Sequence, residues 1–188
     1  TLDLLRPARD TDYNLRGDFG LEIYNAQALK EYKRLGLQSA TLSFELKLAQ
    51  IRDLSKCLDT ELITYGRLPL MITENCLVQN ETGCRLDRQG PCVPEDGPCP
   101  CGQPNVLVDR TGAAFPLLPA YGHRTEIQNS KPLYLADRPE HRRLGLAYAR
   151  LRFTTETAEE CVSVVQNYLD AAPAAGDFTR GLYERGVE

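Results

Sequence analysis

Five cysteines gather in one short, turn-rich segment, and this feature most constrains what the chain can fold into. Glycine or proline occupies nine positions between residues 83 and 104, which forbids long helices or strands there. Such a segment needs something to fold around, and thiolates bind zinc or iron–sulfur clusters. We therefore expect a metal centre, with unligated cysteines or adventitious disulfides as the alternative. The clustered cysteines are Cys76, Cys84, Cys92, Cys99 and Cys101.

The spacing of these cysteines leaves the identity of the metal open. They do not form two C-x-x-C pairs, so a zinc ribbon loses its strongest sequence support. Cys99 and Cys101 are one residue apart, and we expect one of them to be spare. The two remaining cysteines, Cys57 and Cys161, lie on apolar stripes of predicted helices, and we expect both to be core residues.

The bulk properties favour one soluble globular domain over residues 1–188. The chain has 22 basic and 26 acidic residues, so as a whole it lacks the positive charge typical of proteins that bind nucleic acid or anionic membranes. A local basic surface remains open, because Arg150 and Arg152 alternate to one face of a predicted strand. No apolar run is long enough to span a bilayer, and clustered free cysteines suit a reducing compartment. We expect a cytoplasmic protein.

Strands alternate with helices along much of the chain. Strands are predicted near 13–19, 39–45, 60–66 and 146–153. Helices are predicted from an N-cap at Asn25 to a stop at Gly36, over 46–57, near 139–144 and from Thr157. This alternation predicts an α/β fold with a parallel sheet. Short β segments with a turn at residues 110–112 predict a small β and loop insertion over residues 76–135.

Polar side chains follow the first three predicted strands. Asp18 and Glu45 come after the first two strands and are candidates for a proton donor and acceptor, because ligands sit at the carboxyl ends of parallel strands. Arg67 follows the third strand and is a candidate for binding a substrate carboxylate or phosphate. Helix capping for the two acids and a surface ion pair for the arginine are the alternatives. Neither H-E-x-x-H nor G-x-S-x-G occurs.

Several strings of the sequence resemble the collagenase-like peptidase family U32. The most specific is YGRLPLM followed by the NC pair at residues 75–76, and the resemblance covers nearly the whole chain. It also includes GDFGLEIYNAQAL, SATLSFELKLAQIRDLS, LVDRTGAAFPLL, RTEIQNSKPLYLAD and GDFTRGLYERGV.

The resemblance implies a (β/α)₈ barrel that carries a four-ligand iron–sulfur cluster, likewise with zinc as the alternative. By motif, the ligands are Cys76, Cys84 and Cys101. Relatives have a fourth cysteine just before the R-x-x-x-x-N-S string, and here His123 takes that place. Cys92 or Cys99 is the alternative fourth ligand, and a site without a cluster is the third possibility.

The resemblance also implies the candidate functions. We expect an iron–sulfur enzyme in the hydroxylation of RNA or a small aromatic substrate. A collagenase-like peptidase with a peptide substrate and a structural zinc-binding scaffold are the alternatives. Because a full barrel needs about 250 residues, the chain is expected to be the C-terminal half of a (β/α)₈-type barrel. Its expected partner is the rest of the barrel or a second copy of the chain. We do not expect it to bind a membrane.

Overall fold

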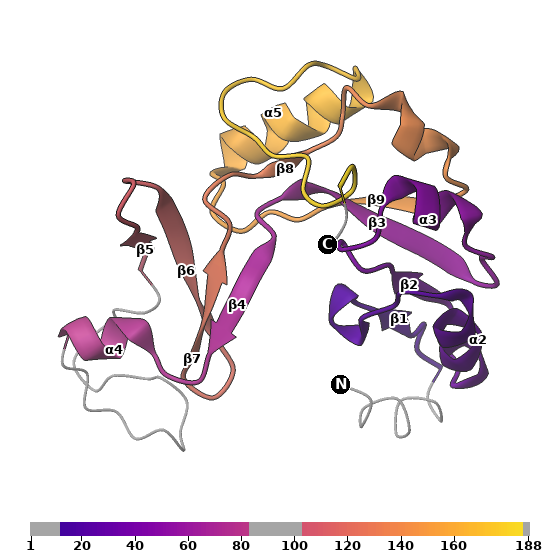
Figure 1. Cartoon of the computed structure of the whole chain (residues 1–188), viewed down its shortest axis with the longest axis horizontal. Coiled ribbons are helices and arrows are strands. Elements are labelled where there is room, and N and C mark those ends of the chain that lie inside the picture. The colour runs from indigo at the N-terminus through magenta and orange to yellow at the C-terminus, as the bar shows by residue number, and fades with distance from the viewer. Residues whose placement is uncertain (1–11, 83–102, 186–188) are drawn as a thin grey trace. The chain divides into compact units, whose positions relative to one another are not determined.

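The computed structural model describes residues 12–82 and 103–185, and the chain divides into two compact units (Figure 1). Unit 1 comprises Thr1–Gly66, Leu133–Phe153 and Ala158–Glu188, and unit 2 comprises Arg67–Pro132 and Thr154–Thr157. Unit 2 contains most of the segment expected to be an insertion. No helix in the described ranges is long and apolar enough to cross a membrane.

Unit 1 is built on a parallel sheet, as the alternation of strands and helices predicts. Its parallel strands are β1 (Arg16–Gly17), β2 (Ser39–Thr41), β3 (Asp59–Gly66) and β9 (Tyr148–Leu151), in the order β1-β2-β3-β9. The short strand β8 (Leu133–Tyr134) pairs antiparallel with the end of β3. The α/β class is confirmed. The described strands form an open sheet and not a closed barrel.

The register of this sheet gathers charged side chains of its strands on one face, here called the polar face. Thr41 pairs with Glu61, and Ile63 pairs with Arg150, so these side chains share one face. Ala40 and Leu62 point to the opposite face and are almost completely buried. Charged side chains in the middle of the strands therefore gather on one side of the sheet.

The helix after β1 begins and ends where its local chemistry predicts. Asn25 caps α2 (Ala26–Arg34), and its side chain accepts a hydrogen bond from the backbone N–H of Ala28 at 2.9 Å. The helix stops before Gly36, whose φ of 101° favours glycine. A single 3-10 turn, η2 (Phe19–Leu21), precedes it, with Asp18 at its N-cap.

The core positions predicted for two cysteines are wrong. The helix α3 (Leu48–Asp53) ends four residues before Cys57, so that cysteine leaves the apolar stripe and is half-buried. Cys161 lies on α5 (Ala158–Leu169), but the face it shares with Val165 and Leu169 is largely exposed. The side chains of α5 that pack on the aromatic cluster around Tyr65 are Val164 and Tyr168. A one-turn 3-10 helix, η4 (Pro139–Arg143), stands where a helix was expected.

Unit 2 is a small antiparallel sheet with one short helix. Its strands are β4 (Pro69–Thr73), β5 (Asn105–Val108), β6 (Ala114–Ala120) and β7 (Arg124–Gln128), in the order β4-β7-β6-β5, and α4 (Leu77–Thr82) follows β4. The predicted turn between β5 and β6 is confirmed. The Asp109 carboxylate accepts hydrogen bonds from the N–H groups of Thr111 and Ala113.

Candidate functional site

Three charged side chains meet on one face of the parallel sheet in unit 1, near the carboxyl ends of β1, β2 and β9. Arg150 of β9 contacts Asp18 in the loop after β1 through Nη1, and its Nε lies 2.8 Å from Oε1 of Glu61 in β3. Two carboxylates share one guanidinium, so this Asp18–Arg150–Glu61 network carries one net negative charge. Carboxyl ends of parallel strands are where α/β proteins place their ligands.

Glu61 is the member of this network that the sequence analysis missed. Its side chain is only 16% exposed, and Oε1 also accepts a hydrogen bond from the hydroxyl of Thr41 at 2.5 Å. Asp18, by contrast, has 63% of its side chain exposed and caps η2 through the N–H of Phe19. A glutamate inside a strand, on the face opposite buried leucines, is the signal that points to it.

Asp18 and Glu45 occupy adjacent loops but do not pair with each other. Glu45 accepts a hydrogen bond from the hydroxyl of Tyr24, and this bond raises the pKa of Tyr24 to about 12. The two loops contact each other through Phe19 and Phe44, whose ring centroids are 5.7 Å apart. The expected donor–acceptor pair is thus two separate carboxylates beside an aromatic contact.

Arg152 lies next to this network, at the end of β9. Its guanidinium carbon is 5.6 Å from the centre of the Phe19 ring, a cation–π contact. A tight crossing with β3 fixes its backbone, because a Cβ on Gly66 would come within 2.0 Å of the Arg152 carbonyl oxygen. Arg152 and the ring of Phe19 therefore lie beside the Asp18–Arg150–Glu61 network, at the end of the polar face.

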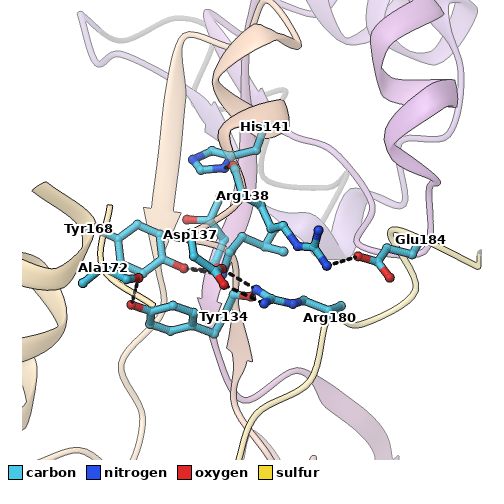
Figure 2. A network of polar contacts seen from close by, with 10 residues as sticks. Tyr134, Asp137, Arg138, His141, Tyr168, Ala172, Arg180 and Glu184 are labelled. Carbon is cyan, nitrogen blue, oxygen red and sulfur yellow. Dashed lines mark hydrogen bonds and ion pairs between the residues drawn. The ribbon is translucent and has the colours of Figure 1, made fainter. Parts of the chain in front are cut away.

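A second polar network in unit 1 ties the C-terminal segment to the loop after β8 (Figure 2). Arg180 forms a two-pronged ion pair with Asp137, at 2.6 and 2.8 Å, and donates to the carbonyl oxygen of Tyr134. The hydrogen bonds from Arg180 hold the pKa of the Asp137 carboxyl below its ordinary value. The charges of Arg180 and Asp137 balance each other and their polar atoms are hydrogen-bonded, so we assign this network a structural role.

Arg67, the predicted anion-binding residue, belongs to unit 2. Its Nη1 donates to the main-chain carbonyl oxygens of Asn129, at 3.0 Å, and of Ser130. These bonds join the chain entering β4 to the segment leaving β7. The structure thus places this nitrogen against the backbone.

Two of the predicted metal ligands lie at the same end of the sheet in unit 2. Thr73 of β4 pairs with Thr125 of β7. Cys76 follows the first threonine by three residues, and His123 precedes the second by two. The N–H of Leu77 donates to the Thr125 hydroxyl at 3.1 Å, which holds the start of α4 against this end.

The other predicted ligands, Cys84 and Cys101, and the alternatives Cys92 and Cys99 lie outside the described residues. Over residues 12–82 and 103–185, no group of three or more histidine, cysteine, aspartate or glutamate side chains is arranged to hold a metal. The described half of the expected donor set is one free thiol and one imidazole, both half-buried, and this pair suits zinc or a cluster iron.

The backbone at His123 is unusual. Its φ of 58° is left-handed, directly after Gly122 at 74°, in the three-residue connection between β6 and β7. A residue other than glycine pays a cost in this conformation, and such residues concentrate at functional sites.

A comparison with protein-family models matches peptidase family U32 over residues 8–99. Searches among curated proteins and among solved structures gave no match. The matched stretch holds β1, β2 and β3 together with Asp18, Glu45, Glu61 and Cys76. This match over just under half of the chain supports membership of peptidase family U32.

Proposed function

We propose that the chain is an iron–sulfur protein of family U32 that takes part in the hydroxylation of RNA or a small aromatic substrate. The observation that carries this proposal is the position of Cys76 and His123 at one end of the β4–β7 pair. Cys84 and Cys101 complete the proposed ligand set. When bound, the cluster supplies redox chemistry or holds an oxygen donor.

The direction in which the described chain approaches Cys76 and His123 supports the proposal. Strand β5 is antiparallel to β6, with Asn105 opposite Leu117 and Val108 opposite Ala114. Because β6 runs on toward His123, the first residue of β5 is the one nearer to the histidine end. The chain therefore re-enters the described sheet, shortly after Cys101, from the end where Cys76 and His123 lie.

The small core of unit 2 is a second support. Its cluster of buried apolar residues consists of Val78, Leu117 and Ile127, with Cys76 packed against it. Domains of this size commonly need a metal or disulfides to fold stably. A metal bound through Cys76 would be joined directly to that core.

For the substrate, we propose the polar face of unit 1 as the binding site. Asp18 and Glu61 offer carboxylate oxygens for hydrogen bonds or proton transfer, and Arg150 holds both in place. Glu45 remains a candidate of the same kind, and Arg67 of unit 2 remains a separate candidate for binding a substrate carboxylate or phosphate. The aromatic pair Phe19 and Phe44 provides a surface on which a ring can stack.

We also propose that the parallel sheet of unit 1 is half of a (β/α)₈-type barrel. In the described part of the chain, β1 pairs only with β2, and β9 pairs only with β3, so each has an edge on which a further strand can add. Light scattering of the purified chain tests whether a second copy supplies the other half. A dimer supports that arrangement, and a monodisperse monomer contradicts it.

Anaerobic purification followed by iron, zinc and acid-labile sulfide analysis tests the proposed cofactor. We expect a brown protein with a broad absorbance near about 400 nm, and loss of iron and sulfide in Cys76→Ala and Cys84→Ala. Cys161→Ala is the matched control and should keep both. A colourless protein with one zinc ion would favour a structural scaffold, and gelatin cleavage that survives both ligand variants would favour a peptidase.

A further inference from the structure

A cavity of about 300 Å³ opens between β9, η4 and α5 in unit 1. Its walls are mainly apolar and include Leu151, Val165 and Leu169. Val165 and Leu169 are 42% and 71% exposed, so the cavity is open to solvent along α5, and its volume suits a small organic molecule. The cavity involves neither the Asp18–Arg150–Glu61 network nor the proposed metal ligands.

One buried histidine gives this cavity a polar group. His141 of η4 lines the cavity and is only 6% exposed. Its Nδ1 contacts the carbonyl oxygen of Arg138 (Figure 2). A carbonyl oxygen only accepts hydrogen bonds, so Nδ1 carries the hydrogen in this contact.

The second ring nitrogen of His141 is then a hydrogen-bond acceptor. Burial lowers the pKa of the imidazole, which keeps the ring neutral and Nε2 without a hydrogen at pH 7. Within the described residues, Nε2 has no hydrogen-bond partner. Because Nε2 is not among the fully buried atoms that lack a partner, a ligand in the cavity can reach it.

Two other polar side chains beside the cavity, Tyr168 and Arg142, already form hydrogen bonds to the protein. The hydroxyl of Tyr168 donates to the carbonyl oxygen of Thr64 and accepts from the N–H of Leu135. Arg142 donates through Nη2 to the carbonyl oxygen of Tyr168 at 3.1 Å. These bonds fix the walls and leave the imidazole of His141 as the acceptor for a ligand.

We propose that this cavity binds a small aromatic molecule with one hydrogen-bond donor, of the phenol or indole class. The donor bonds Nε2 of His141, and the ring lies against Leu151, Val165 and Leu169. The inference goes beyond the proposed function, because it requires neither a metal nor the carboxylates at the strand ends.

Titration of the full chain with phenol and with benzene tests the proposal. Phenol supplies the donor and benzene does not, so phenol should bind about tenfold more tightly. Ala149 lines the cavity from β9, and Ala149→Phe should fill it and weaken phenol binding at least tenfold. Ala114→Phe, the same change on the exposed β6 position of unit 2, is the control and should leave binding unchanged.

The proposal is overturned if phenol and benzene bind equally, if phenol does not bind up to its solubility, or if Ala149→Phe binds phenol as the unaltered chain does. His141→Phe should lower phenol affinity to that of benzene. Should that variant fail to fold, the phenol–benzene comparison and Ala149→Phe still decide the question.

Discussion

The two units bury their apolar side chains to very different degrees. In unit 1, seven large apolar residues have no exposed surface, and they come from α2, α3, the strands and the loops between them: Ile23, Leu29, Leu42, Ile51, Leu62, Ile63 and Leu133. Among the described residues of unit 2, the core cluster has three buried members, each 7–8% exposed. Its edge strands β4 and β5 leave large apolar side chains 43–61% exposed, namely Leu70, Met71, Ile72, Val106, Leu107 and Val108.

This difference indicates two sources of stability. Burial of apolar surface contributes roughly 25 cal/mol per Å² to folding, so the buried core of unit 1 stabilises that unit through its own sheet and helices. The described residues of unit 2 bury few apolar side chains, and they include Cys76 and His123. We infer that unit 1 folds by packing and that unit 2 depends on a bound metal.

Loss of the metal should have the largest effect, and only on unit 2. In Cys76→Ala, unit 2 loses binding free energy on the order of several kcal/mol, because metal binding to such a domain is also folding free energy. Hydrogen exchange measures this unit by unit. Amides of β6 and β7 should exchange at least tenfold faster than in the unaltered chain, whereas amides of β3 keep their rates. Equal protection in both units of the variant would contradict the dependence on metal.

A cavity in the core of unit 1 should come next. Leu62 is fully buried in β3, and Leu62→Ala should lower the free energy of unfolding by about 2–5 kcal/mol. The matched change in unit 2 is Ile72→Ala, at a side chain that is 53% exposed, and it should cost less than about 0.5 kcal/mol. Urea denaturation of both variants measures the difference. Similar losses would show that β4 is covered in solution.

The Asp137–Arg180 ion pair should contribute a smaller, pH-dependent amount. Asp137→Asn removes a charge-assisted bond between side chains that are 26% and 18% exposed, and should cost about 1.5–3 kcal/mol at pH 7. Arg180 lowers the pKa of Asp137 in the folded chain, whereas the unfolded value is about 3.9. The contribution is therefore complete above the unfolded pKa and is lost as pH falls through the folded one.

Thermal unfolding between pH 7 and pH 3 measures this dependence. The advantage of the unaltered chain over Asp137→Asn should begin to shrink below about pH 3.9, at the acid end of the series. A constant difference at every pH would mean that the ion pair is not the source of the stability.

Removal of the α2 cap should have the smallest effect. Asn25→Ala deletes the side chain that accepts from the Ala28 N–H and should cost about 1 kcal/mol. Asn25→Asp keeps an acceptor at the same place and should be nearly neutral. A loss of equal size in both variants, measured by urea denaturation, would mean that the amide group has another role.

Local chemistry made parts of this fold predictable. The cap at Asn25, the stop at Gly36 and the turn after Asp109 each depend on residues within a few positions, so the sequence predicts them correctly. The prediction of which face of α5 is buried was wrong, because long-range contacts decide it. Apolar residues lie on several sides of α5, and those that pack are the ones that contact the cluster around Tyr65, which is distant in the sequence.

The candidate site shows the same limit. Asp18 and Glu45 were found because they directly follow strands. Glu61 was missed because its role depends on Arg150, which comes from a strand nearly ninety residues later, and on the register between β3 and β9. No short-range pattern in the sequence contains that pairing.

The central claim is that Cys76 and His123 hold one metal centre, and iron analysis of two His123 variants tests it most directly. His123→Ala should lose iron and sulfide. His123→Cys should regain about four irons per chain, with a lower reduction potential, because cysteine is the usual cluster ligand and histidine raises the potential. Full iron content in His123→Ala, or the same potential in His123→Cys as in the unaltered chain, would contradict the claim.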